Sequence, residues 1–178
     1  MATKKKNRNE MIIKSFSELA DEATYEDFIF KGCFEWLCEL KPDRKKEKLF
    51  IRRSNQEKIG VDGLVYAMVI KGKIFKIGQT TMKFRGRLSS YNCGRRKFRE
   101  RGTPSTTNFF VLQSLLAINL PVQIYAYFAK KQGYEIFEGT KFAESGVASF
   151  PTPKIIEKKV NIEFIEHYGK SPIGNTQK

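Results

Sequence analysis

Two apolar runs rich in β-branched residues, at 64–70 and 74–78, lie on either side of Lys71-Gly72-Lys73. Such runs, separated by a short segment that contains glycine, predict a β-hairpin. A helix from about Lys83 to Asn92 is expected to follow it directly. This hairpin and its helix constrain the fold more than any other stretch of the chain, so the functional residues are sought on them first.

Four polar side chains lie on the predicted hairpin and helix. Tyr66 lies within the first predicted strand and Lys76 within the second. Arg87 and Tyr91 are four residues apart on the predicted helix, so they share one face. Two phenols, an ammonium and a guanidinium can therefore converge on one spot. Such a set suits a phosphodiester, which needs one group for the attacking water and cations for the charge that develops on phosphorus.

The same residues resemble the signatures of the GIY-YIG nuclease family. The first signature appears as Leu64-Val65-Tyr66 and the second as Lys76-Ile77-Gly78. The family's arginine matches Arg87, because an aromatic residue or histidine normally follows it four positions later, as Tyr91 does here. The resemblance covers residues 60–175, with a gap between 95 and 150.

Two positions depart from the family pattern. Leu64 stands where the first signature has glycine, with Gly63 just before it, and Lys76 stands where the second signature has tyrosine. A lysine at that position is similar to the short GIY-YIG type II restriction endonucleases. The second departure therefore indicates a subgroup of the family.

The resemblance implies an α+β fold, with a central, mostly antiparallel sheet flanked by helices. The length of 178 residues suggests one compact unit. Within it we expect a basic arm and helical extension over residues 1–48 and a GIY-YIG-like nuclease domain over residues 49–178. Apolar spacing in the extension predicts one helix from Glu10 to Leu19 and a second from Thr24 to Leu40. Gly32 lies inside the second helix, so a division into two helices is the alternative.

The C-terminal half contains three further predicted elements. Residues 122–129 predict a strand, and residues 134–137 are a plausible partner strand. A last helix is expected to open at Thr152-Pro153 and to end near Gly169.

The resemblance also implies catalytic roles. Tyr66 would act as the general base toward the water, with help from Lys76, because a free tyrosine has a pKa of about 10. Arg87 would hold the scissile phosphate, and Tyr91 would position it or the leaving side. Two supporting residues that follow the second signature are Gln79 and Thr80.

A glutamate of the last helix would hold a Mg²⁺ (or Mn²⁺) ion, since magnesium takes oxygen ligands. Glu163 is the preferred metal ligand, because the family's glutamate commonly stands at a fixed distance before a proline and an asparagine, as Glu163 does before Pro172 and Asn175. Glu157 is the runner-up, six residues earlier. For either residue, an ordinary surface charge is the alternative.

The helical wheel gives a second argument for Glu163. One inward stripe is predicted to contain Ile156, Val160, Glu163 and His167. One argument favours Glu157 instead. The family usually has an apolar residue three positions after its glutamate, and Val160 meets this for Glu157, whereas Glu166 follows Glu163.

The charge balance predicts a polyanionic partner. Lysine and arginine number 33 against 19 aspartate and glutamate residues, for a net charge of +14, which most often indicates nucleic acid. The candidate DNA-contacting residues are Arg85, Arg95, Arg96, Lys97, Arg99 and Arg101. A solvated basic loop is the alternative for residues 95–101.

A membrane partner is not expected. No lipidation signal is present, and polar residues and a proline interrupt the uncharged stretch at 109–129. That stretch predicts a buried helix, a turn and a buried strand. We expect the protein in the cytoplasm of a prokaryotic cell.

The leading functional hypothesis is a magnesium-dependent, sequence-specific endonuclease for double-stranded DNA, of the type II restriction class. Restriction sites are usually symmetric and both strands are cut, so a homodimer is expected. The alternatives are a GIY-YIG nuclease of the repair or homing type, and a non-catalytic nucleic-acid-binding protein. Incubation with plasmid and magnesium separates these hypotheses.

Overall fold

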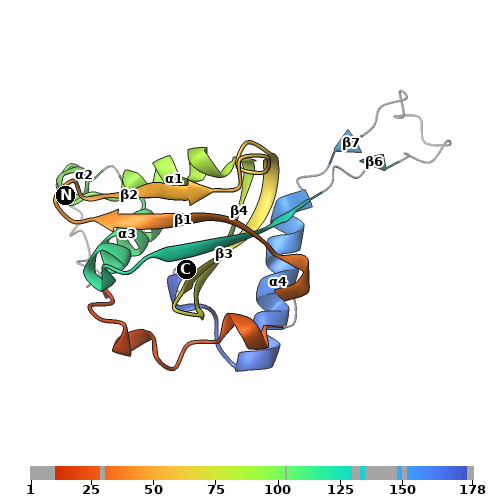
Figure 1. Cartoon of the computed structure of the whole chain (residues 1–178), viewed down its shortest axis with the longest axis horizontal. Coiled ribbons are helices and arrows are strands. Elements are labelled where there is room, and N and C mark those ends of the chain that lie inside the picture. Colours follow the sequence, from red (N-terminus) through yellow and green to blue (C-terminus); the bar gives the residue numbers. More distant parts are fainter. Residues whose placement is uncertain are drawn as a thin grey trace, which may run out of the picture.

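The computed structural model describes residues 11–28, 31–102, 104–129, 133–134, 148–149 and 152–175. Its centre is a five-stranded sheet in the order β2-β1-β5-β3-β4, in which all neighbouring strands are antiparallel (Figure 1). The strands are β1 (Glu35–Asp43), β2 (Lys48–Ser54), β3 (Asp62–Ile70), β4 (Lys73–Lys83) and β5 (Val122–Phe128). The helices are α1 (Phe84–Asn92), α2 (Arg96–Glu100), α3 (Thr106–Ile118) and α4 (Thr152–Tyr168). The α+β class with a central antiparallel sheet is confirmed.

The predicted hairpin is the pair β3–β4, joined by Lys71 and Gly72. Both loop residues have positive φ, 46° for Lys71 and 80° for Gly72. Two left-handed residues in a two-residue loop match the right-handed twist of the flanking strands. Helix α1 follows β4 without a gap, as predicted.

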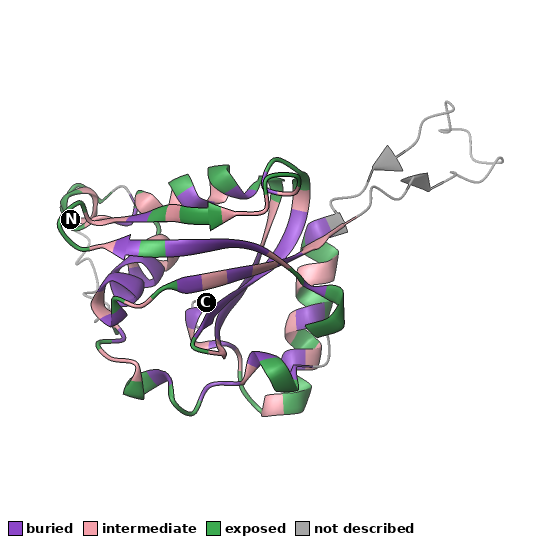
Figure 2. Ribbon diagram, viewed as in Figure 1, coloured by how far each residue is buried: buried purple, intermediate pink, exposed green. Residues whose placement is uncertain are grey.

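Both faces of β3 are buried, which explains its unbroken apolar sequence (Figure 2). The even-numbered residues from 64 to 70 lie in a core that residues of α1 and α3 complete. The odd-numbered residues from 65 to 69 lie in a second core, to which α4 contributes Val160 and Phe164. The sheet is therefore a central layer with helices on both faces.

The N-terminal part differs from the prediction. In place of two helices, its described residues form three 3-10 turns, η1 (Ser17–Leu19), η2 (Tyr25–Asp27) and η3 (Lys31–Cys33), followed by β1. The expected helix up to Leu40 is wrong because β1 pairs with β2 on one side and with β5 on the other. Four consecutive residues of β1, Leu37 to Leu40, are buried, so both faces of the strand are covered and its run does not distinguish it from a buried helix.

The predicted strand at 122–129 is confirmed as β5, but its expected partner is not. Strands β1 and β3 occupy both edges of β5, so no edge is left for residues 134–137. Of these, Tyr134 belongs to β6 (Gly133–Tyr134), which pairs with β7 (Ala148–Ser149), and residues 135–137 lie outside the described residues.

The stretch at 109–129 folds as the predicted helix, turn and strand, in α3 and β5. Across the described residues no helix is long and apolar enough to cross a membrane. The predicted boundary at residue 48 coincides with the first residue of β2, and the division into an extension and a nuclease domain stays a prediction.

Candidate active site

Tyr66 lies in the middle of β3, directly opposite Gly78 of β4. Its phenol packs over the glycine: a Cβ at position 78 would lie 2.5 Å from Tyr66 Oη and 2.7 Å from Cζ. The glycine of the second signature therefore has a steric function, because any side chain there would occupy the space of the Tyr66 ring.

Helix α1 brings Arg87 and Tyr91 to this phenol. The hydroxyl oxygens of Tyr66 and Tyr91 are 2.5 Å apart. Arg87 donates from Nε to Tyr66 Oη at 3.1 Å and from Nη2 to Tyr91 Oη at 3.2 Å. Its guanidinium also lies 4.5 Å from the centroid of the Tyr91 ring. Two phenols and one cation thus form a closed hydrogen-bonded group, made possible by the four-residue spacing on one helical face.

Burial keeps both phenols neutral at physiological pH. It raises the pKa of Tyr66, and the positive charge of Arg87 and the hydrogen bond to Tyr91 act in the opposite direction. The pKa of Tyr91 is raised well above its ordinary value by burial and by the neighbouring Tyr66. One phenol therefore donates a hydrogen bond to the other, and Arg87 donates a hydrogen bond to each of the two oxygens.

Lys76 points from β4 to the same face of the sheet, since its cross-strand partner is Met68, two residues from Tyr66. The ammonium is buried and donates to the Gly174 carbonyl oxygen at 2.7 Å and to Asn175 Oδ1 at 3.3 Å. Burial and the charge of Arg87 lower the pKa of Lys76 to about 8.

Glu157 of α4 has a carboxylate within electrostatic reach of these groups. Burial raises the pKa of Glu157, and the charges of Lys76 and Arg87 oppose that rise. The charge of Glu157 in turn raises the pKa of Tyr66, although its effect is smaller than that of burial. Among the described residues, the Glu157 carboxylate has no hydrogen-bond or ion-pair partner.

The structure does not bring Glu163 into this group. The buried side of α4 contains Val160 and Phe164, while Glu163 is half-buried and His167 is exposed. The predicted inward stripe is therefore wrong at His167, and Glu163 is only half-buried. A turn of 3.6 residues carries the inward side from Val160 to Phe164.

Asn175 connects Lys76 to α4. Its Oδ1 accepts from the backbone N–H of Ile77 at 3.1 Å, and its Nδ2 donates to Asn161 Oδ1 at 2.9 Å. Asn161 donates in turn to the Glu157 carbonyl oxygen at 2.9 Å. Asn161 was not among the residues predicted for the site. The signal for it was an amide four residues after Glu157 on an inward-facing turn of the helix.

Gly174 is the second residue that the sequence analysis missed. A Cβ there would lie 2.8 Å from Lys76 Cβ and 2.9 Å from the Phe75 carbonyl oxygen. The turn η4 (Ile173–Asn175) can pack on β4 only because position 174 has no side chain.

Comparison of the sequence with protein-family models and with curated proteins gives no match. Solved structures do match. The restriction endonuclease HPY188I, solved in complex with product DNA, is 44% identical, and the match covers 100% of this chain and 98% of that chain with a TM-score of 0.72. The chain belongs to the HPY188I family of restriction endonucleases. A mutant of bacteriophage T4 EndoII matches at 18% identity over 86% of this chain and 99% of that chain, with a TM-score of 0.57, and shares the fold.

The two supporting residues have different surroundings in this member of the HPY188I family. Thr80 Oγ1 accepts from the backbone N–H of Met82 at 3.1 Å, so it shapes the end of β4. The buried Oε1 of Gln79 has no hydrogen-bond partner among the described residues. Gln79 lies opposite Val65, one position from Tyr66, and therefore on the other face of the sheet.

The candidate DNA-contacting residues lie at the start of α1 and in the segment that follows it. Arg85 is exposed in the first turn of α1. The segment at 95–101, predicted to be a basic loop, forms the short helix α2 and its two flanking residues. Within it Arg96, Lys97 and Arg101 are exposed.

Proposed function

We propose that this member of the HPY188I family is a sequence-specific endonuclease of the GIY-YIG type, which hydrolyses double-stranded DNA with magnesium. The observation that carries the proposal is the contact of Tyr66, Arg87 and Tyr91, with Glu157 within electrostatic reach. A buried phenol, a guanidinium and a carboxylate together provide the groups that phosphodiester hydrolysis requires.

Tyr66 is the proposed general base, which accepts a proton from the attacking water at its hydroxyl oxygen. It can do so only as a phenolate, which the hydroxyl of Tyr91 would stabilise by a hydrogen bond and Arg87 by its positive charge. Burial works against the phenolate, so the base form is minor in the free protein.

Arg87 is the proposed phosphate ligand. Its side chain covers the two buried phenols and is itself only partly buried. A scissile phosphate would attract the guanidinium strongly, since arginine matches phosphate geometry. Binding would move it toward the DNA and open Tyr66 to water, while Tyr91 would retain its hydrogen bond to Tyr66.

Glu157 is the proposed metal ligand, in place of Glu163. Among the described residues, no three acidic, histidine or cysteine side chains form a metal cluster. A single carboxylate without a protein partner fits magnesium, which keeps several waters and takes one or two carboxylates. When bound, the ion would supply Lewis acidity toward the phosphate oxygens, and manganese could replace it. Lys76 and Asn161 would keep the helix and β4 together at this point.

DNA is the proposed substrate because of the charge of the chain, +14, and because HPY188I was solved with product DNA. Sequence-specific cutting of both strands is supported by membership of a restriction endonuclease family. Two cuts at a symmetric site call for two active sites, so we propose a homodimer on DNA.

The test is a plasmid digest with and without magnesium. Discrete fragments that depend on magnesium support the proposal. A smear would indicate a non-specific nuclease, and intact plasmid with retarded mobility would indicate a binding protein without catalysis. The predicted dimer is tested by analytical sedimentation of the protein bound to a duplex that contains its site, with calcium in place of magnesium. The measured mass gives the number of protein chains per duplex.

A further inference from the structure

We propose that Glu47 and Gln113 are positioning residues that fix the basic helix α2 against the protein so that its cations face the phosphates of bound DNA. This inference rests on the proposed function, because it assigns part of the DNA-binding surface. It concerns residues outside the group of Tyr66, Arg87, Tyr91 and Glu157.

The cation-rich segment needs a specific anchor. Residues 95–101 contain five cations and one acid, and like charges in so short a helix repel one another. Helices of this length are not stable on their own in water. Something in the protein must therefore hold α2 in place.

Glu47 and Gln113 provide that anchor. Glu47 Oε1 accepts from the backbone N–H of Arg96 at 3.0 Å and from Gln113 Nε2 at 2.7 Å. Gln113 Nε2 also donates to the Gly94 carbonyl oxygen at 3.2 Å, and Arg96 Nε donates to Gln113 Oε1 at 3.4 Å. Together, the two side chains hold the backbone just before α2 and at its first residue.

Gln113 is unusual in its surroundings. It lies in the middle of the apolar helix α3, between buried Leu112 and Ser114, and is only 4% exposed. A buried amide costs stability unless its hydrogen bonds are made. Packing alone would be served by an apolar residue, so the amide indicates a requirement for these particular contacts.

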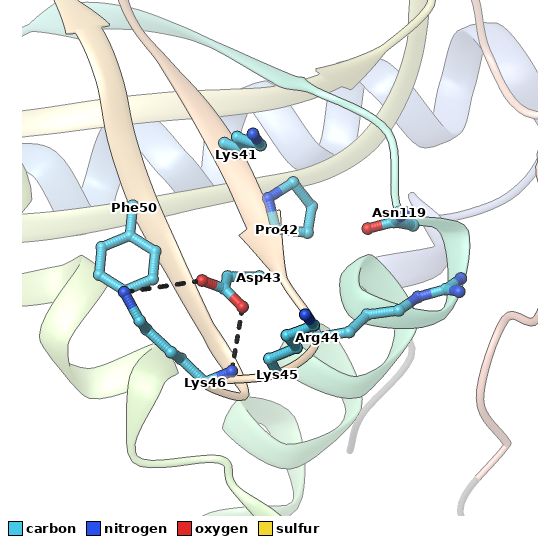
Figure 3. Close-up of a pocket in the computed structure, with 8 residues that line it drawn as sticks. All are labelled: Lys41, Pro42, Asp43, Arg44, Lys45, Lys46, Phe50 and Asn119. Carbon is cyan, nitrogen blue, oxygen red and sulfur yellow. Dashed lines mark hydrogen bonds and ion pairs between the residues drawn. The ribbon is translucent and has the colours of Figure 1, made fainter.

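Glu47 is unusual in its backbone. Its φ is +49°, a left-handed conformation that favours glycine or asparagine. It follows a turn that is held by two further hydrogen bonds. Arg44 donates from Nε to the Leu116 carbonyl oxygen at 2.8 Å. The backbone N–H of Lys46 donates to Asp43 Oδ1 at 3.0 Å (Figure 3). A glutamate in this left-handed backbone conformation indicates that its side-chain contacts to Arg96 and Gln113 are needed.

The anchor also connects α2 to the catalytic helix. Asn92, the last residue of α1, accepts from the Leu49 backbone N–H at 2.8 Å and donates to the Leu49 carbonyl oxygen at 3.0 Å. Gly94 packs so closely on the first turn of α3 that a Cβ there would collide with the Asn108 carbonyl group. The start of β2 thus fixes the end of α1, and the adjoining β1–β2 turn fixes the start of α2.

The effect of Glu47 substitutions on DNA affinity distinguishes a positioning role of Glu47 from the effect of its negative charge alone. Removing Glu47 makes the protein more positive, which by itself strengthens DNA binding. If Glu47 positions α2, its loss weakens binding instead. Glu47→Gly removes the side chain and suits the positive φ, so the fold is retained. Glu47→Gln removes the charge but keeps the oxygen that accepts both hydrogen bonds.

The experiment measures binding of both variants to a fluorescein-labelled duplex of arbitrary sequence, without magnesium, over a series of salt concentrations. Glu57→Gln, at an exposed acid with no side-chain partner among the described residues, is the charge control. We expect Glu47→Gly to bind about tenfold more weakly than Glu47→Gln, because the first turn of α2 is no longer ordered before binding. Its slope of log K against log salt should be flatter by about one to two units, one per lost phosphate contact.

A second readout does not involve DNA. Hydrogen exchange at the Arg96 amide should be faster in Glu47→Gly than in Glu47→Gln. Equal exchange, or Glu47→Gly binding as tightly as Glu47→Gln, would overturn the positioning role while leaving the proposed function intact. Failure of the wild-type protein to bind the duplex would overturn both, and would be seen before any variant is compared.

Discussion

Gly78 stands opposite Tyr66 in the β3–β4 ladder, and the space where its side chain would be is filled by the Tyr66 phenol. The glycine thus determines where the hydroxyl of Tyr66 lies relative to Arg87 and Tyr91. Gly78, which has no side chain, therefore controls the position of the candidate base.

The first prediction follows from this contact. Gly78→Ala would place a methyl group 2.5 Å from Tyr66 Oη, so the phenol must move and cleavage should fall by about 10²-fold or more. Gly60→Ala is the matched control, since a Cβ at Gly60 meets nothing within 4 Å. Cleavage rates and thermal unfolding of both variants check this. Equal activity of the two would show that Tyr66 tolerates displacement.

The positions of three site residues could be predicted from the sequence, because they depend only on local structure. Tyr66, Arg87 and Tyr91 lie on a hairpin and the helix directly after it, where strand pairing and helical spacing fix their relative positions. Arg87 and Tyr91 share a face because they are four residues apart. No long-range information was needed to bring these three side chains together.

The remainder depended on contacts distant in sequence. The choice between Glu157 and Glu163 depends on how α4 is rotated against β3 and β4, and Phe164 fixes that rotation by packing in the core. A single surface helix with apolar residues on several sides gives no clear inward stripe: Ile155 and Ile162 are exposed in this one. Likewise, β1 could not be told from a helix without knowledge of its two partner strands.

The second prediction concerns stability and pH. The pKa of Lys76 is lowered from 10.5 to about 8 in the folded protein, mainly by burial. Between these values the unfolded chain binds a proton that the folded one does not, so this residue makes stability rise with pH from about 8 to 10.5. Below pH 8 the full cost of the buried charge is present.

Lys76→Met should remove that contribution. The unfolding free energies of variant and wild type are measured in urea from pH 7 to 10. As pH rises, the wild type should gain stability relative to the variant, because only the wild type has Lys76. The tyrosines also make the unfolding free energy depend on pH, but they do so equally in both proteins, so their effect cancels when the two free energies are subtracted. A difference that does not change with pH would mean that Lys76 titrates normally.

The third prediction separates the two glutamates. Glu157→Ala should abolish cleavage at every magnesium concentration and still bind DNA, because the half-buried carboxylate beside Lys76 and Arg87 is lost. Glu163→Ala removes a carboxylate from the same helix and should keep most of the activity. Cleavage rates over a magnesium titration check both. The reverse pattern would assign the metal to Glu163 and refute the geometric argument.

The most direct test of the proposed mechanism is the cleavage rate of Tyr66→Phe, compared with that of Tyr127→Phe, at saturating DNA and magnesium. Tyr66→Phe removes one hydroxyl and leaves the ring packed over Gly78, so the fold and DNA affinity should be unchanged. The rate should fall by about 10²–10⁴-fold, the usual contribution of a general base. Tyr127→Phe should cleave like the wild type. A Tyr66→Phe rate close to that of Tyr127→Phe would contradict the role of Tyr66 and the mechanism built on it.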